Sequence, residues 1–136
     1  MPATVDLIIY GSCSNDEQIP NTASGLSLKL GAGNAAAMDV NTACTSFLYG
    51  LSTATAMIRT GVVKTAVVVG VEVISPFLDW RNRNVAVLFG DGAAAVVLQA
   101  CEEPVGVLAE SWAATRMRGR SCAFAVRGSC TRWRAT

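Results

Sequence analysis

The sequence has 136 residues, of which 51% are hydrophobic and 15% are charged. This composition is too apolar for a disordered chain and suits one domain of modest size or part of a larger one. Lys64 and Glu72 interrupt the richest apolar stretch, so no run reaches the roughly 18 residues that a membrane span needs. The net charge of +1 conceals a division, because residues 1–110 carry all ten acidic side chains and residues 111–136 carry six arginines and no acid.

The first part of the chain predicts strands and helices in alternation. In chain order, the expected elements are a buried strand at Val5–Tyr10, a short helix around Leu26–Leu30, a strand at Ala36–Val40, a helix over Thr45–Thr60 and a strand at Lys64–Ile74.

The later elements define the fold class. The β-branched stretch Thr65–Ile74 is typical of a central strand that is covered on both faces. After a linker at Ser75–Asn84, the runs Val85–Phe89 and Ala93–Gln99 flank an Asp-Gly pair and predict a hairpin. The sequence therefore predicts an α/β fold with layers and a mixed sheet, incomplete because two helices cover five strands.

Cys44 is the candidate nucleophile. It lies in Asp39-Val-Asn-Thr-Ala-Cys-Thr-Ser-Phe-Leu-Tyr-Gly50, where a strand leads into a helix. The unpaired N–H groups and the positive dipole end of a helix N-terminus favour a thiolate and can hold an oxyanion. The alternative is a small buried thiol. The chain contains no histidine, the usual base partner of a catalytic cysteine.

The other cysteines predict no metal or redox site. The five cysteines form no Cys-x-x-Cys pair and have no histidine to join them, so zinc is not expected. Cys13 and Cys101 lie in or beside strands and are expected to fill the core. An odd, scattered set of thiols suits a reducing cytoplasm, and the start of the chain has no leader-like segment.

Two further features each have two interpretations. The Phe89-Gly-Asp-Gly92 stretch is expected to be a turn, with Asp91 tying the hairpin, because it lacks the spacing of a nucleotide-binding loop. Asp39 either caps a turn or orients the catalytic loop.

Residues 111–136 differ from the rest in composition. From about Ala113 the chain is rich in arginine, cysteine, tryptophan, glycine and alanine, which is what a GC-rich gene yields when it is translated out of frame. A disordered basic arm and ordinary sequence are the alternatives. Nothing in the folded part supports a nucleic-acid module. We therefore predict a folded region at 1–110 and a basic tail at 111–136.

The ordered motifs resemble one enzyme family. The residues around Cys44, the helix after it, the Thr65–Ile74 strand and Leu88-Phe-Gly-Asp-Gly-Ala-Ala-Ala-Val-Val-Leu98 together resemble the thiolase-fold condensing enzymes, and most closely β-ketoacyl-[acyl-carrier-protein] synthase III. The resemblance covers residues 5–110, well under half of a full-length member. It implies part of one αβα half of the thiolase-like fold, from the N-terminal half of such an enzyme.

The resemblance also implies an acyltransferase of fatty-acid biosynthesis. Cys44 would accept an acyl group from acyl-CoA and condense it with malonyl-[acyl-carrier-protein], with its own backbone N–H in the oxyanion hole. Ile19 would shape the acyl pocket across a homodimer, and the Thr65–Ile74 strand would pair with its twin. Acyl-CoA is a substrate, and no cofactor or metal is implied. Arg81 and Arg83, with Trp80, would meet a CoA phosphate or the carrier protein, or else lie on a solvated linker.

The family's catalytic His and Asn have no counterpart in this chain, so little or no condensation is expected from it. Two alternatives remain open. One is a non-catalytic thiolase-fold piece that acts in interaction or dimerisation, held through the Thr65–Ile74 strand as a sheet edge. The other is a polyketide-type starter acyltransferase.

Overall fold

The computed structural model describes residues 4–110, 115–116 and 122–123. The chain divides into two compact units, Met1–Ala100 and Cys101–Thr136. In the second unit, the short strands β5 (Thr115–Arg116) and β6 (Cys122–Ala123) pair in antiparallel orientation. The predicted out-of-frame or disordered tail at 111–136 lies mostly outside the described residues and stays a prediction.

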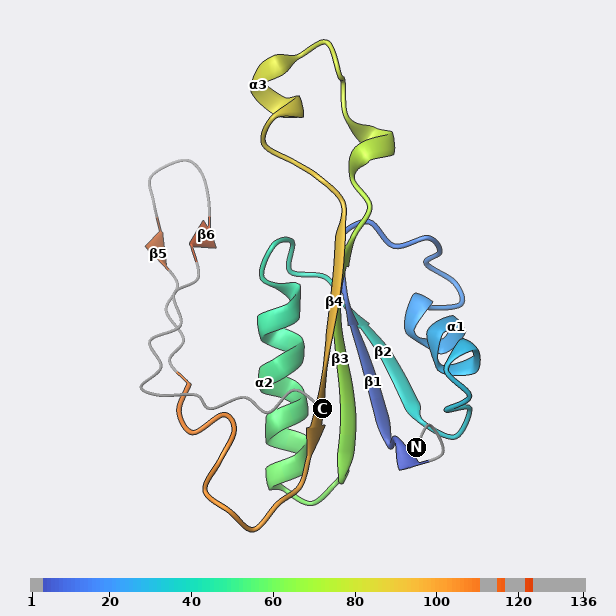
Figure 1. Ribbon diagram of the computed structural model, residues 1–136, viewed down its shortest axis with the longest axis vertical. Coiled ribbons are helices and arrows are strands. Elements are labelled where there is room, and N and C mark those ends of the chain that lie inside the picture. Colours follow the sequence, from blue (N-terminus) through green and yellow to red (C-terminus); the bar gives the residue numbers. More distant parts are fainter. Residues whose placement is uncertain (1–3, 111–114, 117–121, 124–136) are drawn as a thin grey trace. The chain divides into compact units, whose positions relative to one another are not determined.

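The first unit is a four-stranded sheet between two helices (Figure 1). The strand order is β2-β1-β3-β4, with the first three strands parallel and β4 antiparallel to β3. This arrangement confirms the predicted α/β fold with a mixed sheet. The elements, in chain order, are β1 (Leu7–Gly11), α1 (Thr22–Lys29), β2 (Ala36–Val40), α2 (Ser46–Arg59), β3 (Thr65–Glu72), the 3₁₀ turn η2 (Ser75–Phe77), α3 (Arg83–Ala86) and β4 (Gly92–Gln99).

The core has two layers, one on each face of the sheet. Leu7 and Ile9 of β1 lie in the cluster that includes Ala54 of α2. Ile8 of β1 faces the other way and lies in the cluster that includes Ala23 of α1. Successive residues of a strand point to opposite faces, so a strand buried on both faces needs a continuous apolar run. None of the helices in the described residues is long and apolar enough to cross a membrane.

The position of β3 corrects the predicted dimer contact. The strand pairs with β1 on one side and with β4 on the other, which confirms that it is central. The prediction that Thr65–Ile74 pairs with its twin as a sheet edge is therefore wrong, because both sides of β3 are already hydrogen-bonded within the chain. The edge strands of this four-stranded sheet are β2 and β4.

The predicted hairpin is also wrong. Residues 83–86 form the short helix α3 where a strand at Val85–Phe89 was expected, and β4 pairs with β3 instead. The side-chain oxygen of Asn82 accepts a hydrogen bond from the Asn84 N–H at 3.2 Å and caps this helix. A short apolar run does not distinguish strand from helix by itself, so this cap decides the local structure.

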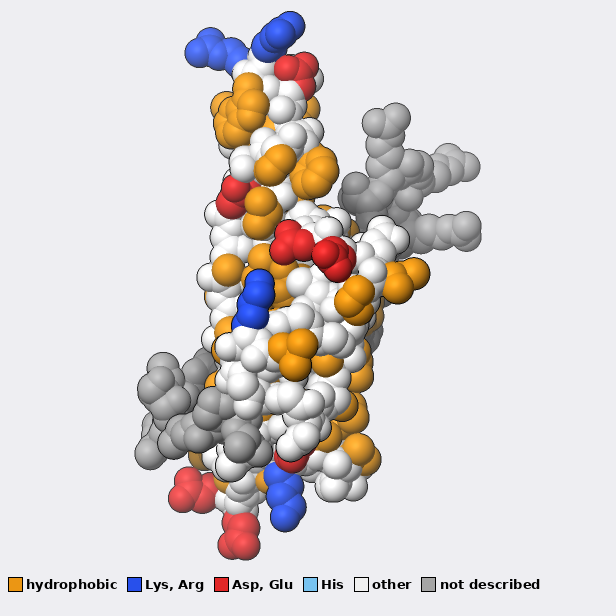
Figure 2. Space-filling model, turned by 90° about the vertical axis from the view of Figure 1, so that its right-hand side faces the viewer, with side chains coloured by type: hydrophobic (Ala, Val, Ile, Leu, Met, Phe, Trp, Pro, Cys, Tyr) orange, Lys and Arg blue, Asp and Glu red, His pale blue; other side chains and the backbone are white. Residues whose placement is uncertain are grey.

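The segment between β3 and β4 projects from the sheet (Figure 1). Figure 2 shows hydrophobic side chains gathered below the Lys and Arg side chains at the tip of this projection. Several of its large apolar side chains are exposed: Phe77, Trp80, Val87 and Leu88. Arg81 and Arg83 are exposed as well.

Candidate active site

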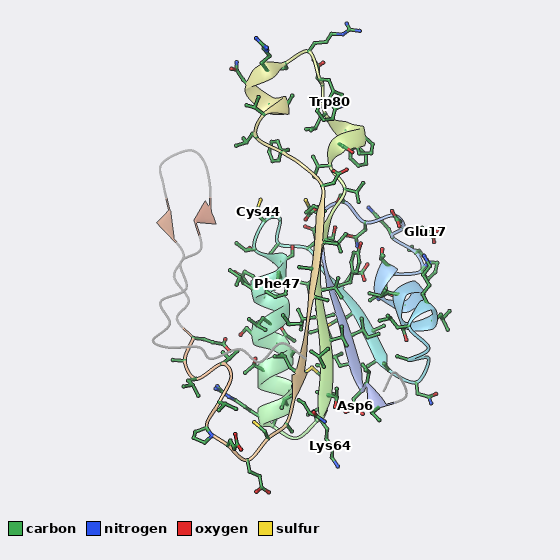
Figure 3. The ribbon with its side chains drawn as sticks, in the orientation of Figure 1. Asp6, Glu17, Cys44, Phe47, Lys64 and Trp80 are labelled. Atoms are coloured by element: carbon green, nitrogen blue, oxygen red, sulfur yellow. The ribbon has the colours of Figure 1, made fainter. Side chains whose placement is uncertain are left out.

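Cys44 lies at the edge of the sheet where the three parallel strands end. Figure 3 shows it at the N-terminal end of α2, whereas Asp6 and Lys64 lie at the opposite end of the sheet. The Cys44 side chain is exposed and unpaired, which excludes the alternative of a buried thiol. It lines a cavity of about 310 Å³ together with Phe47, Glu72 and other residues from these strand ends. Ligands of α/β proteins bind at such carboxyl edges.

The loop before Cys44 has an unusual backbone conformation. Ala43 has a φ of 53°, in the left-handed region that residues other than glycine rarely adopt. The hydroxyl of Ser46 accepts a hydrogen bond from the Thr42 N–H at 2.9 Å and donates one to the Ala43 carbonyl at 2.6 Å. The hydroxyl of Thr45 donates to the Thr42 carbonyl at 2.7 Å. These contacts hold the turn that presents the thiol.

Glu72 lies in the same cavity and ties β3 to the turn that follows β1. Its carboxylate accepts hydrogen bonds from the Ser14 hydroxyl at 2.6 Å and from the Cys13 N–H at 3.0 Å. The Cys13 thiol and the Ser12 hydroxyl donate to it at 3.3 and 3.4 Å. Ser14 in turn accepts from the Val73 N–H at 2.8 Å. These bonds occupy the carboxylate with structural partners, so Glu72 shapes the cavity wall.

The pKa values of this cluster follow from its contacts. Burial raises the pKa of Glu72, but the hydrogen bonds from Ser14, Cys13 and Ser12 outweigh it and hold that pKa below the usual 4.5. Burial, followed by the hydrogen bond to Glu72 and its charge, raises the pKa of the Cys13 thiol. At neutral pH, Glu72 is therefore ionised and Cys13 remains a thiol.

Glu72 is expected to make the stability of the chain depend on acid. Because its folded-state pKa lies below 4.5, its stabilising effect is fully present above pH 4.5 and is lost as the pH falls through that folded-state pKa. The thermal midpoint should therefore fall more on acidification in the wild type than in Glu72→Gln. Thermal melts monitored by circular dichroism measure this difference, and equal falls in the two proteins would contradict it.

Asp91 fixes the other side of the cavity. Its carboxylate accepts hydrogen bonds from the Ile74 N–H at 2.7 Å and from the Ser75 N–H at 2.8 Å, and the Ser75 hydroxyl donates a third at 2.5 Å. The Ser75 hydroxyl above all, then the two N–H groups, hold the pKa of Asp91 below its usual value. Asp91 therefore ties the end of β3 to the start of β4, and not the two strands of a hairpin as predicted. A strand, β4, begins at Gly92, where a nucleotide-binding loop would lead into a helix.

Asp39 caps a helix and does not orient the Cys44 loop. It accepts hydrogen bonds from the Thr22 and Ala23 N–H groups at 2.9 and 2.8 Å, at the start of α1. The Asn15 side chain donates to it at 2.7 Å. A carboxylate at a helix N-terminus satisfies free N–H groups and complements the helix dipole. This geometry supports the capping interpretation.

The structure corrects the prediction for two other cysteines. Cys13 and Cys101 are both exposed, so neither fills the core. Cys13 follows the end of β1 and turns toward Glu72, whereas the Cys101 thiol donates to the Glu103 carbonyl at 3.5 Å just after β4. Residues just beyond the end of a strand lie outside the part of the sheet that the helices cover. A position next to a strand in the sequence does not show whether it is covered.

Ile19 lies away from the Cys44 cavity of its own chain. It is 93% exposed, and Figure 3 places the nearby Glu17 on the α1 side of the sheet, whereas Cys44 is on the α2 side. Its predicted place in the pocket of a second copy stays a prediction. Trp80, on the projecting segment, also lies apart from Cys44 in Figure 3.

Two residues of the site carried weak sequence signals. Glu72 is the only charged residue within the apolar run of β3, and Ser46 follows the candidate nucleophile by two positions. Neither signal indicates a partner, because Glu72 binds a turn that lies 58 to 60 residues earlier. Among the residues that the structure describes, no group of three His, Cys, Asp or Glu side chains could hold a metal ion.

Comparison with known proteins identifies the family. A sequence profile of 3-oxoacyl-[acyl-carrier-protein (ACP)] synthase III matches residues 38–115. The chain is 52% identical over 103 residues to beta-ketoacyl-[acyl-carrier-protein] synthase III 2 of Vibrio cholerae serotype O1. That match covers 76% of this chain and 28% of the relative, so the chain spans under a third of the relative's length.

Solved structures agree with the sequence match. The first is 3-oxoacyl-[acyl-carrier-protein] synthase III from Aquifex aeolicus, with a TM-score of 0.79 and 37% identity over 84% of this chain and 37% of that one. The second is the priming β-ketosynthase of the R1128 polyketide biosynthetic pathway, with a TM-score of 0.73 and 32% identity over 76% of this chain and 31% of that one. The fold is therefore part of the one found in these synthases, and the chain belongs to the 3-oxoacyl-[acyl-carrier-protein] synthase III family.

Proposed function

We propose that this chain carries the acyl-accepting half of a ketoacyl synthase III-type reaction, with Cys44 as the nucleophile. The Cys44 thiolate attacks the thioester carbonyl of an acyl-CoA, a new thioester forms, and the CoA thiolate leaves and takes a proton from solvent. The observation that carries the proposal is the exposed Cys44 thiol in a cavity at the carboxyl edge of the sheet, on a turn held in a strained conformation.

Local backbone groups support this half-reaction. Cys44 lies two residues before the first residue of α2, whose N-terminal N–H groups favour negative charge nearby. In the proposed reaction, the backbone N–H of Cys44 donates to the oxygen that becomes negative in the tetrahedral intermediate. Glu72 and Asp91 are occupied by structural hydrogen bonds, which leaves the thiol as the reacting group of the cavity.

The second half-reaction needs groups that this chain does not have. In the parent activity that we propose, the acyl-enzyme condenses with malonyl-[acyl-carrier-protein], loses carbon dioxide and yields a 3-ketoacyl product for fatty-acid biosynthesis. The chain contains no histidine to assist that step. A homodimer, in which Ile19 contributes to the acyl pocket of the second copy, also belongs to this proposal, as does a cytoplasmic location, which suits the unpaired thiols.

Acetyl-CoA is expected to add one acetyl group to the purified chain, whereas acetyl-CoA with malonyl-[acyl-carrier-protein] should yield no 3-ketoacyl product. Intact-mass spectrometry measures the first reaction, and chromatography of the released acyl groups measures the second. Absence of any acetyl adduct would contradict the proposed function. A 3-ketoacyl product would show that condensation proceeds without histidine and would contradict the limit to one half-reaction.

A polyketide starter acyltransferase is the second candidate. The similarity to the R1128 priming β-ketosynthase favours it, because the chain resembles that structure nearly as well as it resembles the Aquifex aeolicus enzyme. Both candidates use the same Cys44 chemistry and differ in the acyl group and pathway. Acetyl uptake well below uptake of longer or branched acyl groups would favour the polyketide candidate.

A non-catalytic interaction role is the third candidate. The edge strands β2 and β4 and the exposed apolar side chains of the projecting segment favour it (Figure 2). It becomes the leading interpretation if Cys44 takes up no acyl group.

A further inference from the structure

The peptide group between Ala43 and Cys44 is held from its carbonyl side. The Ala43 carbonyl oxygen accepts two hydrogen bonds from Ser46, one from the hydroxyl at 2.6 Å and one from the backbone N–H at 3.0 Å. A peptide group is planar and trans, so the Cys44 N–H points away from that carbonyl. Any contact that fixes the direction of the carbonyl therefore also fixes the direction of the Cys44 N–H.

The Ser46 hydroxyl is itself fixed. Ser46 is the first residue of α2 and is only 2% exposed. Its oxygen accepts a hydrogen bond from the Thr42 N–H at 2.9 Å, and its one proton is committed to the Ala43 carbonyl. The hydroxyl thus joins the Thr42 N–H to the carbonyl of Ala43, the residue with the positive φ. This bridge stabilises a conformation that alanine otherwise disfavours.

We propose that Ser46 is a positioning residue for acyl transfer to Cys44. Its hydroxyl and N–H hold the Ala43–Cys44 peptide so that the Cys44 N–H faces the oxygen of the acyl carbonyl under attack. The two bonds to the carbonyl also polarise the same peptide group, which strengthens its N–H as a donor. This inference rests on the proposed function, because it concerns the oxyanion of that half-reaction.

Two reactions of the same thiolate separate positioning from general damage to the site. In acetylation, the sulfur adds to the thioester carbonyl, the π electrons move to oxygen, and the intermediate then expels the CoA thiolate. The Cys44 N–H stabilises that oxygen. In alkylation by iodoacetamide, the sulfur displaces iodide from a saturated carbon and no oxyanion forms. Only acetylation should depend on the direction of the Cys44 N–H.

The test compares the two rates in Ser46→Ala. The rate of acetylation of Cys44 by acetyl-CoA is expected to fall roughly ten- to hundredfold, whereas alkylation by iodoacetamide should stay within about twofold of the wild type. Mass spectrometry of the Cys44 peptide measures both rates. Thr55→Ala is the matched control, because Thr55 is also buried in α2 and its hydroxyl donates to the Leu51 carbonyl at 2.8 Å, away from the cavity. It should leave both rates unchanged.

Each other outcome overturns a defined part of the account. If the wild type is acetylated and Ser46→Ala keeps the wild-type ratio of the two rates, the role of Ser46 is wrong and the proposed function stands. If both rates fall together, or Thr55→Ala lowers the ratio equally, the effect is general and the role is again wrong. A wild type that takes up no acetyl group overturns the proposed function and this inference with it.

A second pair of variants covers a folding failure. If Ser46→Ala lacks the circular dichroism spectrum of the wild type, Ser46→Thr and Ser46→Cys are compared, since donor strength falls from hydroxyl to thiol. The ratio of acetylation to alkylation at Cys44 should be lower in Ser46→Cys than in Ser46→Thr. Equal ratios in these two variants would overturn the role of Ser46.

Discussion

Replacing Cys44 by alanine is expected to abolish acetyl uptake from acetyl-CoA, the largest functional effect that we predict. The other described thiols lack the surroundings of Cys44. Burial and then the contact with Glu72 raise the pKa of Cys13 and keep it a thiol. Cys101 follows β4 in the chain and is not among the residues that line the cavity. Intact-mass spectrometry of Cys44→Ala after incubation with acetyl-CoA gives the result directly.

Cys13→Ala is the matched control for that experiment. Cys13 is also exposed, and its thiol donates a hydrogen bond to Glu72, which lines the same cavity. It is not expected to react. This variant should therefore take up one acetyl group as the wild type does. If acetyl uptake survives in Cys44→Ala and disappears in Cys13→Ala, the nucleophile is Cys13 and its assignment to Cys44 is wrong.

Gly11→Ala is expected to have the largest effect on stability. Gly11 ends β1 under the start of α2, and a Cβ atom at this position would lie 2.9 Å from the backbone carbon of Ser46 and 3.0 Å from the backbone nitrogen of Phe47. Backbone atoms cannot rotate away as a flexible side chain can, so the helix must shift. We expect a loss of about 3 kcal/mol in the free energy of unfolding, measured by denaturant titration.

Gly25→Ala is the control for that substitution. Gly25 lies within α1, and a Cβ atom there meets nothing within 4 Å. Alanine should stabilise this helix by roughly 0.5 to 1 kcal/mol relative to glycine. If Gly11→Ala is as stable as Gly25→Ala, the close approach of α2 to β1 in this structure is wrong.

The helices and strands could be predicted where the local sequence has a clear hydrophobic periodicity. The strand at Ala36–Val40 has its predicted bounds, and α2 differs from its prediction by one residue at each end. Both depend on local periodicity and on clear ends. The segment at Val85–Phe89 has no such pattern, because its few apolar residues suit either a strand or a helix and the Asn82 cap selects a helix.

Strand order could not be predicted from local sequence. The apolar run of Thr65–Ile74 indicated a central strand, whereas the family resemblance implied a strand that pairs with its twin. Only the pairing of β3 with β1 and β4 decides between the two. A strand at the centre of the sheet is covered on both faces, and this position explains the apolar residues of Thr65–Ile74 without contact to a second copy of the chain.

The candidate site could be predicted only in part. Cys44 was evident because a cysteine between a strand and a helix has a recognisable local context. Glu72 and Ser46 were missed, since their roles depend on hydrogen bonds to a distant turn and to one peptide group. The exposure of Cys13 and Cys101 was missed for a similar reason, because a position beside a strand does not reveal where the covering layer ends.

The central claim is that Cys44 is the acyl-accepting thiol of this chain, and one measurement tests it most directly. The wild-type protein is incubated briefly with acetyl-CoA, digested, and the acetyl group is quantified on the peptides of Cys13, Cys44 and Cys101. We predict acetyl on the Cys44 peptide and none above background on the other two. An even distribution over the three exposed thiols would indicate unassisted chemical acetylation and would contradict the account.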